Sequence, residues 1–183
     1  PPPLFSLSFA FAMSVKLGRC CPDAGSAAHR ARPSVVYEVA VIEIRRSALV
    51  KYSPMQMFEL VNDVEAYPKH FAWCAGAEIL ERQGDVLVAR LDLKFAGLRQ
   101  SFTTRNTVDP PVRLQMSLVD GPFRSLEGVW DFIALGKAGC KVAFALDFDY
   151  AGRLGGGALK LGFQGLAGRM VDDFCSEAER IYG

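Results

Sequence analysis

Histidine, cysteine and net charge are what this sequence has least of. It contains 2 histidines and 5 cysteines, and its 21 Lys and Arg residues nearly balance its 20 Asp and Glu residues. A net charge of +1 lacks the basic excess typical of proteins that charge draws to nucleic acid. The cysteines are odd in number and show no C-x-x-C spacing, so we expect a reducing compartment and no zinc site. These scarcities argue against metal-dependent and charge-driven functions.

Long apolar runs are also scarce. No stretch approaches the roughly 20 apolar residues that a membrane-spanning helix needs, so we expect a soluble, cytoplasmic protein. The run Leu4–Met13 resembles a signal-peptide core, but no basic residue precedes it. Arg19–Pro33 is small, polar and basic, without helical or strand periodicity. We therefore predict a disordered extension at residues 1–40, with a targeting segment or an ordered arm as alternatives; its three initial prolines would also suit an over-extended reading frame, a fragment or a processed form.

The remaining residues, 41–183, have the composition of one domain. Half of the chain is apolar, enough to bury a core without metal or disulfides. Val41–Tyr52 alternates apolar and polar side chains, which predicts a first strand. Ser53–Gln56 combines an N-cap serine, a following proline and a capping glutamine, which predicts a helix start. Tyr67-Pro68 is expected to end that helix, and a short helical turn is predicted at Lys69–Phe71.

Alternating segments separated by compact turns fill the middle of the chain. The predicted strands are Ala77–Arg82, Val86–Phe95, Arg99–Val108, Val112–Val119, Ser125–Leu135 and Cys140–Tyr150. Their short, Gly- and Pro-rich connections favour antiparallel neighbours. Each strand with a clear alternation has one apolar face, which requires a cover on one side.

The last segment supplies that cover. From about Ala158 onward, apolar residues recur at helical spacing, which predicts a long C-terminal helix on the sheet and hence an α+β domain. Gly162, Gly165 and Gly168 weaken this helix, and the glycine-rich run Gly152–Gly157 precedes it. The glycines allow two interpretations, close packing against bulky sheet residues or a mobile lid over a cavity.

Four motifs resemble a known family. They are Ala48–Ser53, Leu60–Pro68, Phe102–Asn106 and Leu118–Phe123. In this order they are similar to the RatA group and its relatives, the coenzyme-Q-binding START-domain proteins of the polyketide cyclase superfamily, over about Ile44–Tyr182. The resemblance implies the helix-grip fold: a curved antiparallel sheet of about seven strands, two short helices and a long C-terminal helix.

The same resemblance implies three functions. Some members are described as binding ubiquinone or similar polyprenyl lipids in support of respiration. The RatA name denotes a toxin that associates with the large ribosomal subunit and blocks subunit joining, and older labels describe oligoketide cyclases or aromatases. We expect non-enzymatic binding of a quinone-like lipid, with ribosome association and cyclisation as alternatives.

The residues themselves indicate no catalytic group, metal ligand or cofactor. No nucleophile with a base and no poised acid pair is evident. His29 falls in the extension and His70 in a predicted surface turn. Asp147 and Asp149 lie on the phase opposite the apolar face of their strand and are predicted to be solvated.

A cavity between the sheet and the last helix would suit a lipid tail. The resemblance favours the following lining residues: Trp73, Leu91, Leu93, Phe95, Phe102, Met116, Leu118, Trp130, Phe144, Leu146, Phe148, Phe163, Leu166, Met170 and Phe174. Each of them is also an ordinary core candidate. Trp73 and Tyr67 are the candidates to meet a polar head group.

The expected partners follow from these alternatives. A hydrophobic small molecule comes first, the large ribosomal subunit is the alternative, and peripheral contact with a membrane is left open. Arg45, Lys51, Arg105 and Arg124 are predicted to be exposed, either as a ribosome-contacting face or as a solvated basic face.

Overall fold

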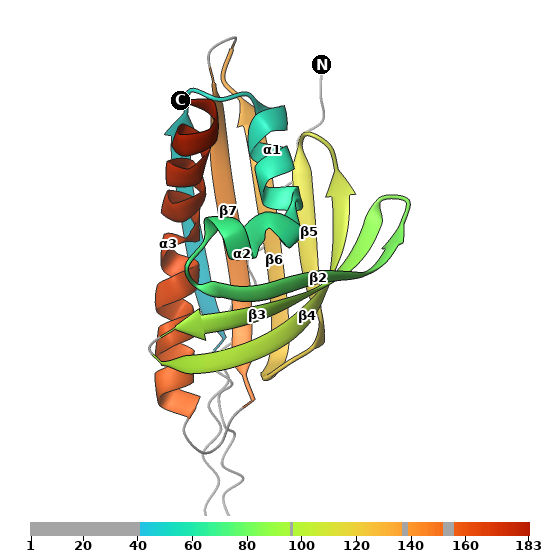
Figure 1. Ribbon diagram of the computed structural model, residues 1–183, viewed down its shortest axis with the longest axis vertical. Helices are drawn as coiled ribbons and strands as arrows, with labels where there is room; N and C mark the ends of the chain where they lie inside the picture. The colour runs from blue at the N-terminus through green and yellow to red at the C-terminus, as the bar shows by residue number, and fades with distance from the viewer. Residues whose placement is uncertain (1–40, 96, 137–138, 152–155) are drawn as a thin grey trace, which may run out of the picture. The chain divides into compact units, whose positions relative to one another are not determined.

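The computed structural model describes residues 41–183 except 96, 137–138 and 152–155. The extension predicted at residues 1–40 and most of the glycine run at 152–157 therefore lie outside the described residues. Within the described part, the chain forms one antiparallel sheet and a set of helices on its inner side (Figure 1). The predicted α+β helix-grip architecture is confirmed.

All seven predicted strands are present. They are β1 (Ile42–Val50), β2 (Cys74–Gln83), β3 (Val86–Phe95), β4 (Leu98–Asp109), β5 (Arg113–Asp120), β6 (Phe123–Ala134) and β7 (Cys140–Tyr150). Their order in the sheet is β1-β7-β6-β5-β4-β3-β2, and every neighbouring pair is antiparallel. The first and last strands in sequence pair with each other, so the meander closes back on its start.

Some predicted strand ends are wrong by a few residues. β1 stops at Val50, and β2 begins at Cys74 rather than Ala77, because Cys74 pairs with Leu93 before a register shift. β6 begins at Phe123, which pairs with Tyr150 on the far side of another shift. Bulges of this kind break the strict alternation on which boundary predictions depend.

The helices are α1 (Pro54–Asn62), the 3-10 turn η1 (Val64–Ala66), α2 (Tyr67–His70) and α3 (Gly156–Tyr182). The predicted capping box is confirmed: the Gln56 backbone N–H donates to Ser53 Oγ at 3.2 Å, and the Ser53 N–H donates to Gln56 Oε1 at 2.9 Å. The prediction that Tyr67-Pro68 ends the first helix is wrong, because α1 already ends at Asn62; the helical turn predicted at Lys69–Phe71 is present as α2, which starts two residues earlier. Pro68 lies in the first turn of α2, where the missing N–H costs no helical hydrogen bond.

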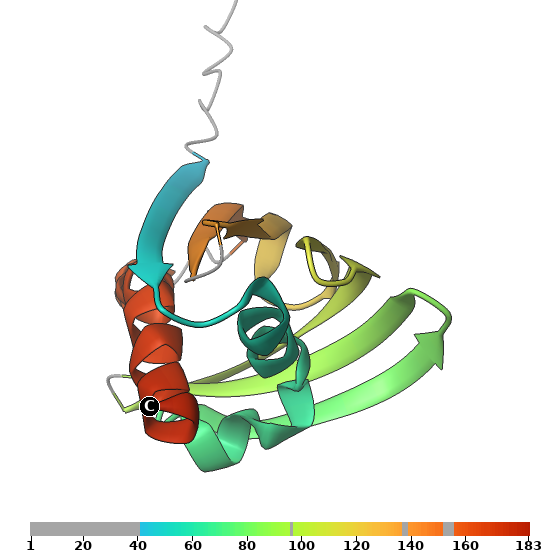
Figure 2. The same cartoon turned by 90° about the horizontal axis from the view of Figure 1, so that it is seen from above.

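The sheet curves around the helices. Seen from above, it wraps past α1, while α3 lies along the side where β1 and the tips of β3 and β4 approach each other (Figure 2). The turns that connect β2 to β3 and β3 to β4 contain Gly84 and Gly97 with φ of 56° and 76°, values that favour glycine. Trp130, Phe144, Phe148 and Phe174 are each at most 2% exposed and lie between the sheet and the helices. The core is therefore the contact between the concave face of the sheet and the helical layer.

Candidate functional site

A cavity of about 50 Å³ lies between the concave face of the sheet and α3. Its wall is made mainly of apolar side chains from α1, η1, β3 to β7 and the first half of α3, with Tyr67 of α2 and Trp73 at one end. Such a volume holds a few water molecules, whereas pockets for organic ligands usually measure about 300 Å³ or more. In this conformation the site is closed, and a lipid would have to displace part of the wall.

Most of the predicted lining residues do line the cavity. Those that do are Trp73, Leu91, Leu93, Phe102, Met116, Trp130, Phe144, Leu146, Phe163, Leu166 and Met170. They share an inward position on consecutive strands or on one stripe of α3, which is the pattern that the sequence periodicity predicts. The structure shows only that these residues line the cavity; that they bind a ligand stays a prediction.

Four predicted lining residues lie elsewhere. Phe148 is fully buried against Phe163, with ring centroids 4.8 Å apart, and Phe174 packs 4.6 Å from Phe71. Phe95 lies under α3, where a Cβ added at Gly162 would come within 2.5 Å of its ring. Leu118 packs partly buried against the edge of the core. All four are apolar and follow the same periodicity as the lining residues of their own strands or helix, so periodicity alone does not distinguish the cavity wall from the solid core.

Other residues of the wall were not predicted. They are Val61, Val64, Ala89, Thr104, Asn106, Leu114 and Leu126. Ala89 and Leu114 share the alternation of the predicted residues on their strands and could have been included on that ground. Thr104 and Asn106 are polar residues at inward positions, and a buried polar residue on an apolar face is itself a signal of function.

Asn106 is the most unusual of these. Its side chain is 4% exposed, it lines the cavity, and its Oδ1 has no hydrogen-bond partner within the described part of the chain. Thr104, two residues earlier on β4, is 3% exposed and lines the same wall. Leaving a buried amide oxygen unpaired costs about 1–3 kcal/mol. The cavity therefore carries one polar group that a ligand could satisfy.

The two residues predicted to meet a head group are already engaged. The Tyr67 hydroxyl donates to the Val61 carbonyl, and burial raises the pKa of this phenol well above its usual range. Trp73 is 4% exposed, and its indole Nε1 donates to Asp173 Oδ2 at 3.0 Å. Both rings form one end of the cavity, but their polar atoms point to protein partners. The prediction that they meet a head group is not supported by this geometry.

One part of the wall is adjustable. Met116 on β5 extends its methyl group over Gly128 on β6, where an added Cβ would collide with it. Met170 on α3 also lines the cavity and is only partly buried. Methionine side chains are flexible and fill irregular gaps, so these two residues can rearrange more easily than the aromatic wall.

The C-terminal half of α3 is tied to α2 by charged groups. Glu177 is 7% exposed, and its carboxylate accepts one bifurcated hydrogen bond from Arg180 Nε and another from Arg180 Nη2. The carboxylate also contacts His70 Nδ1. Hydrogen bonds from Arg180 lower the pKa of Glu177 below its usual value, with a further contribution from the charge of His70. His70, predicted in a surface turn as a solvated or capping residue, is the last residue of α2; its side chain is 20% exposed, and its Nδ1 contacts Glu177 on α3, more than a hundred residues away in sequence.

The charged residues of the outer face are partly paired. Arg45 binds Asp147 in a two-pronged ion pair with distances of 2.6 and 2.9 Å, and Arg124 binds Asp149 at 3.0 Å. Asp149 is 7% exposed, so the prediction that it is solvated is wrong: Arg124 sits at the β6 register shift opposite it and covers it.

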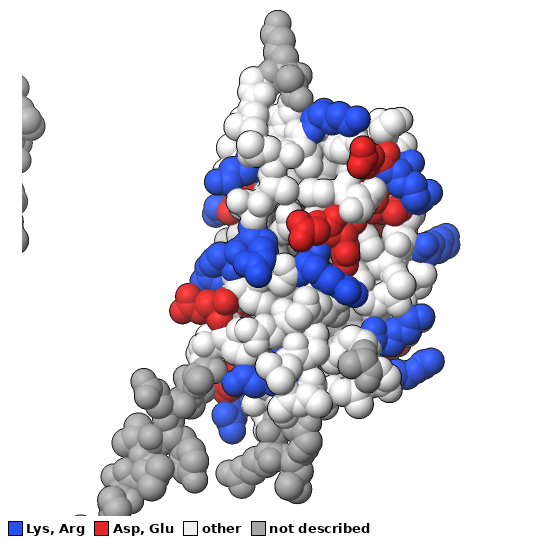
Figure 3. Space-filling model, turned by 90° about the vertical axis from the view of Figure 1, so that its left-hand side faces the viewer, with Lys and Arg blue, Asp and Glu red and all other residues white. Residues whose placement is uncertain are grey.

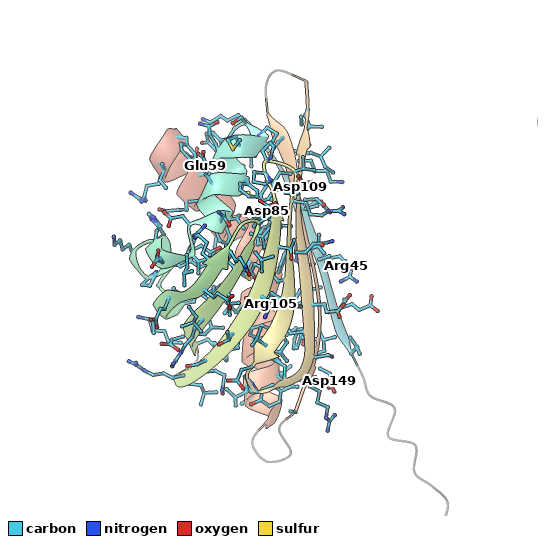
Figure 4. The ribbon with its side chains drawn as sticks, turned by 90° about the vertical axis from the view of Figure 1, so that its right-hand side faces the viewer. Arg45, Glu59, Asp85, Arg105, Asp109 and Asp149 are labelled. Atoms are coloured by element: carbon cyan, nitrogen blue, oxygen red, sulfur yellow. The ribbon has the colours of Figure 1, made fainter. Side chains whose placement is uncertain are left out.

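The four basic residues predicted as a face are exposed but do not form one continuous surface. Lys51 lies beyond the end of β1, 5.7 Å from the Tyr52 ring. Arg45 and Arg105 lie on β1 and β4, with three strands between them (Figure 4). The labelled acidic side chains lie toward both ends of the same view.

The cavity wall offers little acid–base chemistry. Its lining includes no Asp, Glu, His, Lys or Arg, and Tyr67 is its one titratable residue. Among the described residues, no group of three or more His, Cys, Asp and Glu side chains could hold a metal ion. No helix within the described ranges is long and apolar enough to cross a membrane.

The chain is similar in sequence to one protein family and to several of its members. The profile of the family described as polyketide cyclase / dehydrase and lipid transport matches residues 50–175. The ribosome association toxin RatA of Pseudomonas aeruginosa is 44% identical over 140 residues, which cover 76% of this chain and 97% of that protein. The mitochondrial coenzyme Q-binding protein COQ10 homolog B of Xenopus laevis is 29% identical over 147 residues, 78% of this chain and 60% of that protein.

Solved structures are similar in fold. The ZhuI aromatase/cyclase from Streptomyces sp. R1128 superposes with a TM-score of 0.68 at 20% identity, covering 77% of this chain and 95% of that one. At this level of identity, the similarity shows the shared fold alone.

Proposed function

Because the chain belongs to the polyketide cyclase, dehydrase and lipid transport family, and within it to the RatA and coenzyme-Q-binding START-like group, we propose that it binds one quinone-like lipid in the cavity under α3. The relatives support a lipid-binding or a RatA-type role. The finer assignment, a ring with a polar substituent and an apolar tail, is our proposal.

The observation that carries the proposal is Asn106. An apolar cavity with a single unpaired amide suits a ligand that is mostly hydrocarbon and has one carbonyl or hydroxyl group. A hydroxyl, as on the reduced quinol form, would donate to Oδ1 and remove the penalty that this oxygen carries in the empty protein, whereas a quinone carbonyl can only accept a hydrogen bond from the amide Nδ2. The tail would be bound by apolar burial, at about 25 cal/mol per Å².

Binding requires the site to expand. The present volume of about 50 Å³ is too small for a benzoquinone ring with a prenyl tail. Movement of Met116 and Met170 can supply part of the space, and displacement of the first half of α3 the rest. If the expanded state is a minor one, the apparent affinity is reduced by its population. We therefore expect moderate affinity for short-chain quinones.

Tryptophan fluorescence provides a direct test. The chain has two tryptophans, Trp73 and Trp130, and both line the cavity. A quinone that enters should quench both by contact, so titration with a short-chain ubiquinone should give saturable quenching with a stoichiometry of one. Native mass spectrometry of the same sample should show the complex.

Gly128→Ala is the variant that tests whether the quinone binds in the cavity. The added methyl group pushes Met116 toward the cavity without changing a surface residue, so quenching should weaken about tenfold or more while the fold is kept. Equal quenching of the wild type and the variant would place the quinone outside the cavity. A wild-type protein that remains ligand-free at saturating ubiquinone would refute the proposal.

Association with the large ribosomal subunit is the second candidate. It is favoured by the 44% identity to the P. aeruginosa ribosome association toxin over nearly all of that protein. Induced expression followed by sucrose-gradient analysis should then raise the ratio of free subunits to monosomes. An unchanged ratio would count against it.

Cyclisation of a poly-β-ketone is not what the wall favours. Such a reaction needs proton transfer, and the one titratable lining residue, Tyr67, has a raised pKa and already donates to a carbonyl. Incubation with a poly-β-keto substrate is expected to give no cyclised product, and a cyclised product would contradict the binding proposal.

A further inference from the structure

The first turns of α3 and the β3–β4 turn form one end of the sheet–helix layer. Gly162 of α3 lies directly on the Phe95 ring, and Phe95 pairs with Leu98 across the β3–β4 turn. The turn and the start of the helix are therefore neighbours in space, although more than sixty residues separate them in sequence.

Apolar side chains are exposed at this end. Leu161, one residue before Gly162, is 70% exposed, and only Leu49 among the exposed large apolar residues of the described chain exceeds it. Phe95 and Leu98 are each partly exposed. A single exposed leucine is ordinary, but apolar side chains that gather on neighbouring elements form a patch of the kind that marks an interaction site.

The charges around these side chains are basic. Lys94 and Arg99 flank the turn, and Lys160 precedes Leu161. The sequence contains no acidic residue from Tyr150 to Val171, and none from Leu93 to Arg99. In Figure 3, Lys and Arg side chains lie around a mainly uncharged area over the lower part of α3, with some acidic side chains along one edge of the view.

Asp92 on β3 and Asp149 on β7 are already paired. Asp92 accepts a hydrogen bond from Arg90 at 3.0 Å, and Asp149 one from Arg124 at 3.0 Å. Apolar tips within a basic border are complementary to a membrane surface that contains anionic lipids.

We propose that Phe95, Leu98 and Leu161, bordered by Lys94, Arg99 and Lys160, form a surface that docks on anionic lipid bilayers. This inference rests on the proposed function, because a lipid ligand has to leave a bilayer to reach the protein. The docking surface lies on two elements that also contribute to the cavity wall: Leu93, next to Lys94 on β3, and Phe163, next to Gly162 on α3, both line the cavity. A bilayer at this end would therefore touch two of the elements that enclose the ligand.

RNA is the other polyanion that a basic border could meet. Proteins that hold single-stranded RNA use aromatic side chains on which bases stack. Here the most exposed side chain is an aliphatic leucine, and Phe95 is covered on one side by α3. The observations therefore favour a lipid surface.

Vesicle flotation with the ligand-free full chain tests the proposal. The protein should float with vesicles of phosphatidylcholine and phosphatidylglycerol, and bind vesicles of phosphatidylcholine alone at least about fivefold more weakly, since each basic residue near an anionic surface contributes about 1 kcal/mol. Raising the ionic strength should weaken binding. Equal binding to both kinds of vesicle, or none to either, would overturn the proposal.

Two variants locate the surface independently. Leu161→Asp removes the exposed apolar side chain, and Arg99→Glu reverses one charge of the border; each should reduce flotation at least about fivefold. Leu49→Asp is the matched control. Leu49 is about as exposed as Leu161, at 73%, but it lies near the C-terminal end of β1 and belongs neither to the β3–β4 turn nor to the start of α3. Equal loss in Leu49→Asp, or no loss in both Leu161→Asp and Arg99→Glu, would contradict the assignment.

The quinone titration separates this proposal from the proposed function. Leu161 and Arg99 do not line the cavity, so both variants should retain tryptophan quenching by a water-soluble short-chain quinone. Flotation without quenching would leave the docking surface in place and refute the ligand. Loss of binding to large ribosomal subunits in these variants, with vesicle binding unchanged, would assign the surface to the ribosome and overturn the proposal.

Discussion

Asn106 is the residue at which stability and the proposed ligand recognition should oppose each other. Its unpaired Oδ1 penalises the empty protein, and replacement by leucine of similar size would remove the penalty. Asn106→Leu should therefore raise the free energy of unfolding of the ligand-free protein by about 1 kcal/mol and weaken quinone binding about tenfold, the equivalent of one hydrogen bond. Urea unfolding and the fluorescence titration measure the two effects.

Asn62 offers the control for this variant. Its Oδ1 is also buried and has no hydrogen-bond partner among the described residues, but it lies at the end of α1 outside the cavity lining. Asn62→Leu should leave quinone binding unchanged. If Asn106→Leu binds quinone as well as the wild type does, the ligand does not use this amide.

At the scale of elements, the glycines of α3 divide into two kinds. Gly162 is required by close packing, since a Cβ there would come within 2.5 Å of Phe95. Gly165 has nothing within 4 Å of an added Cβ, and Gly168 has only an Arg46 Nη2 at 3.6 Å. Close packing therefore explains Gly162 but not Gly165, and the mobile-lid interpretation stays a prediction.

Gly165→Ala should stabilise the protein. Alanine favours a helix interior over glycine by about 1 kcal/mol, and no atom opposes the new methyl group. We expect the free energy of unfolding to rise by about 0.5–1 kcal/mol in urea titrations. Gly162→Ala is the comparison and should lower it. If Gly165→Ala also slows quinone exchange, flexibility of this half of α3 controls access to the cavity.

The tie between α2 and α3 should make stability depend on pH. The pKa of Glu177 is lowered in the folded state, so its ion pairs contribute fully above the unfolded pKa of about 4.3 and are lost as the pH falls through the folded value. Glu177→Gln should cost about 1–3 kcal/mol near pH 7, the usual range for hydrogen bonds to charged groups.

The difference in the free energy of unfolding between the wild type and Glu177→Gln should become smaller below about pH 4. Urea unfolding of both proteins at pH values from about 7 down to below 4 measures this difference. Asp92 also has a lowered pKa, but it is present in both proteins, so its contribution to the pH dependence cancels in the difference. A difference that does not vary with pH would mean that Glu177 acts through packing alone.

Periodicity predicts the elements better than the site. The alternation of β3 and β7 and the capping box at Ser53 are local patterns, and the structure reproduces them. The cavity, in contrast, depends on contacts between residues far apart in the sequence. Phe144 lines the cavity and Phe148 lies in the solid core, and this difference depends on which side chains of α3 pack against each of them. The same holds for His70, whose partner lies at the other end of the chain.

At the scale of the molecule, ligand binding and stability should be coupled. A ligand at about one hundred times its dissociation constant adds about 2.7 kcal/mol to the free energy of unfolding. For a domain of this size, that corresponds to a rise in Tm of about 5–10 °C. Scanning calorimetry with and without saturating short-chain ubiquinone measures the shift. An unchanged Tm under conditions that quench the tryptophans would mean that the quinone binds the unfolded chain equally well.

The pairing of β1 with β7 also governs when the domain can form. Ile42 lies opposite Phe148, so the first strand has no partner until about a hundred more residues have been made. The helix that closes the layer comes later still. Contacts so distant in sequence slow folding and leave apolar surface exposed on the emerging chain. A chain shortened at its C-terminus should therefore aggregate or be degraded rather than fold in part, and the native sheet should appear only after synthesis is complete.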